Sequence, residues 1–263
     1  VITKQGVEEL VLVGGSETIA AKTVAVQPFE AWNERDYGRP YSDAAAGMLP
    51  PKVARMIVNI ARAPLARSHL ARQGETLLNP TLLDPFCGMG TIVAEALLTG
   101  WNGIGSDVNG EIVAKAIKNI AWVSEKFPAQ GTARFFTSDA THVSGVLGGE
   151  KVDAIVTEPF MGSTTIATKA ASGRVNMEAV QNTLKGLEKL YIGCLREWHM
   201  CLVPAGLVVM AIPSYTLGGR TLFVKKVIDR CESLGYTITA GPIEYGRPQA
   251  VVRRNFYVFR KKK

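Results

Sequence analysis

Acidic residues follow four short apolar segments of the chain, at the points where strands would end. Segments of this kind that alternate with helical patterns form a parallel sheet, and the carboxyl ends of its strands meet at one edge, where ligands bind. A single acidic residue there is weak evidence, because turns and helix N-termini also favour Asp. Four in succession predict one carboxylate-lined site that favours a cationic ligand. The four residues are Asp84, Asp107, Asp139 and Glu158.

A turn with two glycines follows the first of these residues. Leu82–Asp84 has the pattern of a buried strand, and the helical spacing of apolar residues starts at Ile92. Gly88 and Gly90 permit the backbone angles of a tight turn and allow a ligand to approach the main chain. The segment lacks the spacing and the Lys of a phosphate-binding P-loop. We therefore predict a ligand-binding turn, with an ordinary strand-to-helix turn as the alternative.

Two blocks of sequence resemble known families. Residues 84–91, Asp-Pro-Phe-Cys-Gly-Met-Gly-Thr, resemble the signature of S-adenosylmethionine-dependent amino-methyltransferases. Residues 35–40, Arg-Asp-Tyr-Gly-Arg-Pro, and 47–52, Gly-Met-Leu-Pro-Pro-Lys, resemble the tRNA guanosine-N2 methyltransferases that usually carry an RNA-binding THUMP domain in front. The resemblance spans about residues 20–260. It implies an α/β, Rossmann-like class I methyltransferase fold: a mixed seven-stranded sheet with helices on both faces and a terminal antiparallel strand pair.

The predicted organisation divides the chain at residue 35. Residues 1–35 form a β-rich N-terminal extension, which the resemblance implies to be a link to an RNA-binding domain, and residues 36–263 form the catalytic domain. Proline is tolerated in the first helical turn, so a helix is expected to begin at Pro50 or Pro51. The other expected elements are strands over Leu10–Val13 and Thr23–Val26, a polar connection over 64–80, helices over Met177–Leu202 and Arg220–Leu234, and terminal strands over Tyr236–Ile243 and Val251–Phe259.

The resemblance implies S-adenosylmethionine as the cofactor. In dinucleotide-binding folds an acidic residue about 20 positions after the first strand binds ribose hydroxyls, so Asp107 takes that role or, alternatively, caps the following helix. Asp139 and a neighbouring backbone amide would hold the adenine amino group, and the block around Asp36 and Met48–Pro50 would close over the methionine part. The implied cofactor-binding residues are Asp36, Leu49, Asp84, Phe86, Cys87, Gly88, Gly90, Thr91, Asp107, Val108, Asp139 and Ala140.

The catalytic residues that the resemblance implies follow the fourth strand. Amino-methyltransferases have Asp, Asn or Ser there, followed by Pro-Pro and Tyr or Phe, whereas this chain has Glu158, Pro159 and Phe160 with one proline. An alignment without a gap puts Met161 at the aromatic position; if Phe160 is the stacking aromatic, the acid shifts by one place. Glu158 and the Pro159 carbonyl would accept the hydrogens of a nucleobase amine, and the flipped base would lie against Phe160. The alternative for Phe160 is a core position.

Basic residues are concentrated in the last part of the chain. The net charge is +7, and residues 220–263 hold 11 Lys or Arg against three acidic residues. This asymmetry favours a polyanionic partner, which the resemblance implies to be tRNA or another structured RNA, with a solvated terminus as the alternative. Residues 162–174 are rich in Ser, Thr and Gly, which is typical of a mobile flap over the target base. The implied substrate-binding residues are Met161, Gly162, Lys169, Arg174, Arg247 and Arg253.

Composition argues against several other classes. No apolar run reaches the roughly 18 residues that a membrane helix needs, and there is no signal peptide, so we expect a cytoplasmic protein without a membrane partner. The four cysteines form no C-x-x-C pair and have no His at metal spacing, which predicts reduced thiols and no metal. Cys87 has no adjacent base, so we expect it to pack beside the strand rather than to act as a nucleophile.

Three functions fit these features. The first is methyl transfer from S-adenosylmethionine to the exocyclic amine of a guanosine in tRNA or a related structured RNA, in some family members with a small activating protein subunit. The second is a DNA adenine-N6 or cytosine-N4 methyltransferase, which shares the chemistry at the fourth strand, although no target-recognition domain is recognisable. The third is a catalytically silent, cofactor-binding RNA-binding subunit, which the departure at Glu158, Pro159 and Phe160 suggests.

Overall fold

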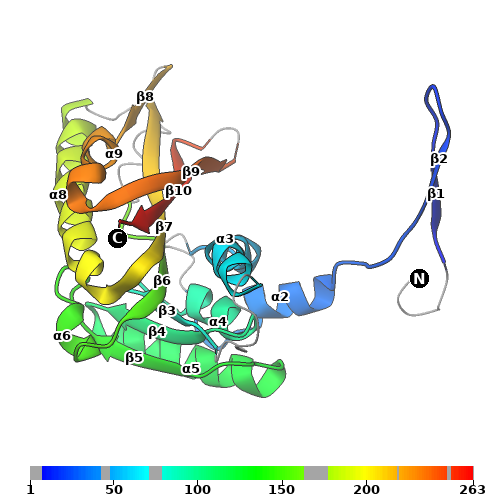
Figure 1. Cartoon of the computed structure of the whole chain (residues 1–263), viewed down its shortest axis with the longest axis horizontal. Helices are drawn as coiled ribbons and strands as arrows, with labels where there is room; N and C mark the ends of the chain where they lie inside the picture. The colour runs from blue at the N-terminus through cyan, green and yellow to red at the C-terminus, as the bar shows by residue number, and fades with distance from the viewer. Residues whose placement is uncertain are drawn as a thin grey trace. The chain divides into compact units, whose positions relative to one another are not determined.

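A computed structural model of the chain describes residues 8–42, 48–70, 79–162, 177–217, 219–247 and 250–262. The chain forms two compact units, Val1–Gly38 and Arg39–Lys263, and we describe each by itself. Figure 1 shows the elements of both units. Within the described ranges, none of the helices has both the length and the hydropathy that crossing a membrane requires.

The first unit contains a β-hairpin and a helix. β1 (Leu10–Val13) pairs antiparallel with β2 (Ile19–Lys22), and α2 (Phe29–Tyr37) follows. The prediction of the second strand at Thr23–Val26 is wrong, because the turn occupies only residues 14–18 and pairing resumes directly after it. The predicted domain division at residue 35 falls inside α2 and stays a prediction.

The second unit is built on one mixed sheet, whose main strands are β3 (Thr81–Asp84), β4 (Asn102–Asp107), β5 (Ala133–Thr137), β6 (Val152–Thr157), β7 (Leu202–Leu217), β9 (Tyr236–Tyr245) and β10 (Val252–Lys261). They follow one another in the order β5-β4-β3-β6-β7-β10-β9, and β10 is antiparallel to both of its neighbours. This arrangement confirms the predicted mixed sheet with a terminal antiparallel pair. The strand order reverses between β3 and β6, so the topological switch point, where such sheets bind ligands, lies there.

A short eighth strand, β8 (Arg220–Phe223), pairs antiparallel with the end of β7. The predicted helix over Arg220–Leu234 is therefore wrong in its first part. The helical residues are α9 (Lys225–Arg230) and the 3-10 turn Glu232–Leu234. Gly219 has φ 74°, a left-handed conformation that lets the chain reverse tightly, so β8 runs back along β7.

Helices cover both faces of the sheet. They are α3 (Pro51–Leu70), α4 (Thr91–Leu97), α5 (Gly110–Lys126), α6 (Ser144–Leu147) and α8 (Met177–Cys201). α8, α6 and α9 share one core, whereas α3 packs in a second core on the opposite face and α4 with α5 forms a third. In β7, Val208 and Met210 belong to the α8 core and Leu207 and Val209 to the α3 core, as the period of two in a strand requires. Figure 1 shows α8 along one side of the sheet.

α3 is longer than predicted. It begins at Pro51, as expected, but continues to Leu70, so residues 64–70 are helical rather than part of a connection. Pro64 costs the helix one internal hydrogen bond, while its Ala and Arg neighbours have high helix propensity. The apolar stripe that includes Val53 and Ile57 is buried against the sheet. This packing keeps the first turn of α3 fixed on the second core.

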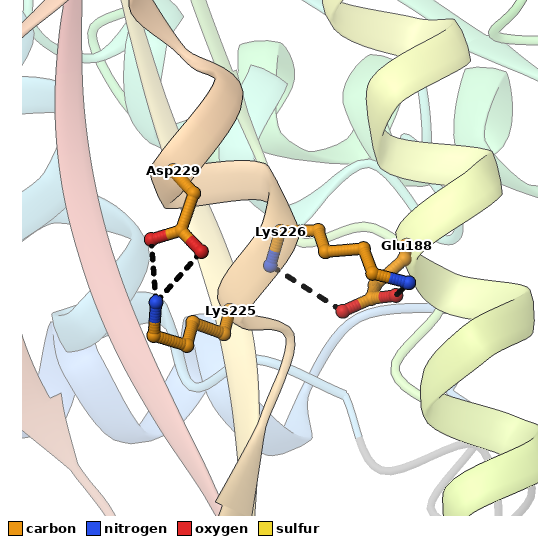
Figure 2. Close-up of polar contacts among 4 residues, drawn as sticks. All are labelled: Glu188, Lys225, Lys226 and Asp229. Carbon is orange, nitrogen blue, oxygen red and sulfur yellow. Dashed lines mark hydrogen bonds and ion pairs between the residues drawn. The ribbon is translucent and has the colours of Figure 1, made fainter.

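Ion pairs connect α9 to α8 and run along α9 itself (Figure 2). Lys226 Nζ lies 3.2 Å from Glu188 Oε2 on α8, and Lys225 Nζ lies 2.7 Å from Asp229 Oδ2 one turn along α9. Such exposed pairs each contribute only about 0–1 kcal/mol. The pair with Glu188, which lies outside residues 220–263, nevertheless compensates part of the excess positive charge of that segment.

A substitution at Gly105 in β4 tests the packing of the third core, to which Cys87 and Phe135 belong. A Cβ atom at Gly105 would lie 2.6 Å from Phe135 Cδ1 and 3.1 Å from Cys87 Cβ, so Gly105→Ala forces the partly buried Phe135 and the buried Cys87 to move. We expect the free energy of unfolding to fall by about 1–3 kcal/mol in urea denaturation. Gly186→Ala in α8, where an added Cβ meets no atom within 4 Å, is the control and should raise it by up to about 1 kcal/mol. Equal effects of the two substitutions would contradict the described packing.

Candidate active site

The four acidic residues lie along one edge of the sheet. Asp84 and Asp107 end β3 and β4, Glu158 comes directly after β6, and Asp139 follows β5 by two residues. Because the strand order is β5-β4-β3-β6, they line the edge in the order Asp139, Asp107, Asp84, Glu158. Asp84 and Glu158 therefore flank the topological switch point.

Asp84 is the buried member of this set. Its side chain is 1% exposed, and its Oδ1 accepts hydrogen bonds from Thr157 Oγ1 at 2.7 Å and from Phe86 N at 3.2 Å. Burial raises the pKa of Asp84 to about 7; the nearby charges of Asp107 and Glu158 act in the same direction, and the two hydrogen bonds act against it. The three carboxylates are thus close enough to interact electrostatically.

The glycine turn leaves part of its main chain open. Gly88 has φ 49° and Gly90 has φ 83°, in the left-handed region that favours glycine. A Cβ atom at Gly88 would meet no atom within 4 Å, whereas one at Gly90 would lie 3.5 Å from Ala116 Cβ. Cys87 N donates to Ser106 O at 2.9 Å and so anchors the turn to β4. The backbone at Gly88 is therefore the part of the turn that a ligand can approach.

Cys87 packs into the core between α4 and α5, and Phe86 packs against the core under α8. Cys87 is buried, and burial raises the pKa of its thiol well above its usual range, so the thiol stays protonated. The Phe86 ring meets the Trp198 ring edge to face, with 6.4 Å between centroids. The thiol environment agrees with a packing role for Cys87 rather than a nucleophilic one.

Asp107 does not cap the helix that follows β4. The N-cap of α5 is Asn109, whose Oδ1 accepts a hydrogen bond from Glu111 N at 2.9 Å. Asp107 instead accepts from Gly88 N at 3.2 Å and from Asn109 N at 3.0 Å, which holds its carboxylate against the glycine turn. The helix-capping alternative is therefore removed. The next residue, Val108, is exposed.

Asp139 is an exposed carboxylate held by its own turn. Thr141 N and Thr141 Oγ1 donate to Asp139 Oδ1 at 2.8 and 2.7 Å, and these hydrogen bonds lower the pKa of Asp139. Ala140 is buried, and its carbonyl accepts from Trp198 Nε1 at 3.0 Å. Within the described ranges, no group of three or more His, Cys, Asp or Glu residues is arranged to hold a metal ion.

Glu158 forms an ion pair with Arg254 of β10. Arg254 Nε donates to Glu158 Oε1 at 2.6 Å. The Arg254 side chain is 19% exposed and that of Glu158 is 14% exposed. Burial raises the pKa of Glu158, and the guanidinium of Arg254 opposes that shift. Pro159, the next residue, is buried. Sequence reasoning missed Arg254, because no local spacing connects residues 96 positions apart.

Two tyrosines hold the backbone after Pro159. Tyr191 OH on α8 donates to Phe160 O at 2.7 Å, and Tyr215 OH on β7 donates to Met161 O. Burial raises the pKa of Tyr215 to about 12 and that of Tyr191 well above its usual range, so both hydroxyls remain donors. Although its backbone is held, the Phe160 side chain is 57% exposed, which excludes the core alternative for this ring.

Asn119 joins the segment before α3 to the glycine turn. Its Oδ1 accepts from Tyr41 N at 2.9 Å, and its Nδ2 donates to Tyr41 O and Met89 O, each at 3.0 Å. Arg39 Nη1 donates to Thr91 Oγ1 at 2.8 Å, at the start of α4. Sequence reasoning missed Asn119, which lies mid-helix, whereas Arg39 belongs to the block at 35–40.

The remaining cofactor candidates have different surroundings. Leu49 is buried in the core under α3. Asp36 belongs to α2 of the first unit. The structure of the second unit therefore places Leu49 among core residues, and the assignment of Asp36 depends on the sequence block alone.

The substrate candidates are only partly described. Arg253 forms an ion pair with Glu244 between β10 and β9, and Arg247 is exposed. Gly162 has φ 99°, and a Cβ atom there would collide with Tyr215 OH. The predicted flap lies outside the described residues beyond Gly162, and with it the candidates Lys169 and Arg174.

Comparison with known proteins identifies this arrangement. Residues 43–217, about two thirds of the chain, match the RMKL-like methyltransferase domain family. The chain belongs to this family. The match includes all four acidic strand ends of the methyltransferase domain and stops before β8, so α9, β9 and β10 lie beyond it.

A curated relative is a longer protein that matches this methyltransferase domain over part of its length. This relative, from Methanothermobacter thermautotrophicus and named tRNA (guanine(10)-N2)-dimethyltransferase, is 29% identical over 200 residues, which are 75% of this chain and 48% of that protein. The chain thus spans about half the length of the relative.

Solved structures share the fold of the domain. The crystal structure of TrmN from Thermus thermophilus has a TM-score of 0.56 at 21% identity, covering 94% of this chain and 57% of that one. Magnesium protoporphyrin IX methyltransferase (ChlM) from Synechocystis PCC 6803 with bound SAM has a TM-score of 0.51 at 14% identity, covering 89% and 91%. At these identities the two structures support the class I methyltransferase fold.

The buried carboxyl of Asp84 predicts a pH-dependent stability. Its pKa of about 7 exceeds the ordinary value of 3.8, so between these values the folded state binds more protons than the unfolded state. The free energy of unfolding should therefore fall as the pH rises from about 4 to about 7, by up to about 4 kcal/mol from this group.

Urea denaturation of the ligand-free chain across this pH range measures the effect. Asp84→Asn, which cannot ionise, should flatten the decrease. Asp229→Asn, on the surface of α9, should leave it unchanged. A slope that is the same in Asp84→Asn and the unmodified chain would contradict the described environment of Asp84.

Proposed function

We propose that this domain binds S-adenosylmethionine at the carboxyl edge of β3 to β6 and methylates the exocyclic amine of a guanosine in tRNA. The observation that carries the proposal is the row of four acidic residues across the topological switch point, from Asp139 to Glu158. The family membership and the relative named tRNA (guanine(10)-N2)-dimethyltransferase support the reaction class and the substrate.

The residues at this edge fit such a cofactor. Gly88 offers main chain with open space around it, and the Asp107 carboxylate beside it provides acceptors for the two hydroxyls of a ribose. Asp139, exposed and with a lowered pKa, is suited to the adenine amino group. Carboxylates and the Phe86 ring favour a cationic sulfonium. The ChlM structure with bound SAM shows that a protein of this fold holds the cofactor.

The other cofactor residues position this set. Cys87 and Thr91 fix the two ends of the glycine turn: Cys87 N donates to Ser106 O, and Thr91 Oγ1 accepts from Arg39 Nη1. Gly90 supplies the left-handed backbone conformation within the turn. We assign a wall of the site to Leu49, Val108 and Ala140, and we retain Asp36 on the basis of the sequence block.

Residues after β6 would hold the target base. When bound, the cofactor supplies a methyl group activated by its sulfonium sulfur, which keeps the electron pair of the bond that breaks. Glu158 Oε2 and the Pro159 carbonyl accept the two hydrogens of the amine and orient it. Because the new nitrogen–carbon bond leaves the amine with a surplus proton, Glu158 accepts that proton. The exposed Phe160 ring provides a stacking face for a base taken out of its helix.

Basic residues would contact the RNA backbone. Arg253 lies near the start of β10 and Arg247 just after the end of β9, and both adjoin the carboxyl edge because β10 begins where β7 ends. We assign Lys169 and Arg174 the same role, and Met161 and Gly162 the entrance to the base site. Phosphate contacts of this kind add affinity that decreases with salt. The proposal extends to a small activating subunit, which the sequence resemblance implies for some family members.

Asp107 provides a direct test of cofactor binding. Asp107→Asn removes the charge and one of the two acceptors, and hydrogen bonds to charged groups contribute about 1.5–3 kcal/mol. We therefore expect the Kd for S-adenosylmethionine, measured by isothermal titration calorimetry, to rise roughly 10- to 100-fold. Asp229→Asn, a surface carboxylate on α9, is the matched control. An unchanged Kd in Asp107→Asn would contradict the assignment.

Methylation of tRNA tests the reaction itself. The chain is incubated with unmodified tRNA transcripts and methyl-labelled S-adenosylmethionine, and the RNA is digested to nucleosides. We expect labelled N2-methylguanosine that is lost in Glu158→Ala. Label on duplex DNA but not on tRNA would overturn the substrate, and cofactor binding without any label in RNA or DNA would favour a catalytically silent RNA-binding subunit.

A further inference from the structure

The ion pair between Glu158 and Arg254 joins two strands that are not neighbours. Arg254 lies opposite Pro213 of β7, and β7 separates β10 from β6. The Arg254 side chain must therefore cross β7, which continues to Leu217, to reach the residue after β6, where its Nε donates to Glu158 Oε1 at 2.6 Å. Both side chains are mostly buried, so this contact is not a surface pair that solvent weakens.

Both partners lie on the face of the sheet that α3 covers. Ala154 and Val156, at even positions of β6, belong to the α3 core, and so do Phe256 and Val258 of β10. Because side chains alternate along a strand, Arg254 shares the face of Phe256. The pair is therefore set by the register of two strands and not by a flexible surface side chain.

The Glu158 carboxylate needs more contacts to fix its position than an Asp followed by two prolines would need. Its side chain has one more rotatable bond than Asp, and only one proline follows it. Three elements supply the missing support: β10 through Arg254, α8 through Tyr191 and β7 through Tyr215. The tyrosines hold the backbone carbonyls of Phe160 and Met161 but leave the Glu158 carboxylate itself to Arg254.

The groups around Glu158 make its protonation state depend on the contact with Arg254. Asp84 of β3 and Tyr191 of α8 interact with Glu158 electrostatically, and neither provides a positive charge. Burial favours the neutral form of Glu158, which is unable to accept a proton, and the guanidinium of Arg254 favours the ionised form. Arg is suited to this task because its planar N–H groups fix the orientation of a carboxylate as well as its charge.

We propose that Arg254 is the positioning residue for Glu158: it binds Oε1 and leaves Oε2 directed at the target amine. The inference rests on the proposed function for the identity of the amine. It assigns a role in the reaction to β10, a strand beyond the residues that match the methyltransferase family. Arg254 does not touch the substrate; it acts through Glu158.

The test compares pH profiles of kcat for tRNA methylation. In Arg254→Met, Glu158 loses its counter-charge, so the acidic limb of the profile should move to higher pH, with at least a tenfold loss of kcat at pH 6 that becomes smaller at pH 9. Arg254→Lys keeps the positive charge, so the acidic limb of its kcat profile should lie close to that of the unmodified chain. Arg134→Gln, which removes an exposed ion pair with Glu150, is the control and should leave the profile unchanged. A loss in Arg254→Met that is equal at every pH would overturn the proposal.

A second readout does not depend on catalysis. In the chain labelled with carbon-13 at Glu carboxyls, the Glu158 signal, assigned by its absence in Glu158→Gln, should titrate at higher pH in Arg254→Met than in the unmodified chain. The double variant Glu158→Gln/Arg254→Met should be no slower than Glu158→Gln alone. If the unmodified chain binds the cofactor but methylates no tRNA, the proposed function fails, and the titration decides on Arg254: an unchanged Glu158 pKa overturns its role.

Discussion

The hydrogen bond from Thr157 to buried Asp84 is the contact on which the site depends. It joins the ends of β3 and β6, the two strands between which the order of the sheet reverses. Because Asp84 is buried, its carboxyl is held in one place, and the turn that follows is held with it through the bond to Phe86 N. The acidic residues of the neighbouring strands take their positions relative to this fixed point.

Long-range contacts then complete what the strands begin. Asn119 attaches the segment around Tyr41 to the glycine turn, and Ser106 anchors Cys87 to β4. On the other side of Asp84, Tyr191, Tyr215 and Arg254 hold the residues after β6. The cofactor side and the substrate side of the proposed site are thus supported by separate sets of buried polar groups. Since buried polar groups are costly when unpaired, each set favours a single geometry.

Much of this arrangement follows from local sequence. Alternating strands and helices, acidic strand ends and the two-glycine turn are short-range patterns, and they predicted a parallel sheet with Asp84, Asp107, Asp139 and Glu158 at one edge. The family resemblance added the terminal antiparallel pair that makes the sheet mixed. Choices between nearby residues were harder: both Asp107 and Asn109 are good helix caps, and only the structure shows that Asn109 caps α5. β8 was missed because Arg220–Phe223 has no strand pattern of its own and pairs through a reversal at Gly219. Arg254 and Tyr191 were missed because their partners lie far away in sequence.

The central claim is that the acidic strand ends form one site for one cofactor. A crystal structure of the chain with S-adenosylhomocysteine, the product form of the proposed cofactor, tests it most directly. The account predicts the ribose hydroxyls on Asp107, the adenine beside Asp139, the main chain of Gly88 along the ligand, and the sulfur facing the gap between Asp84 and Glu158. A ligand bound elsewhere, or bound at this edge with Asp107 and Asp139 both out of contact, would contradict it.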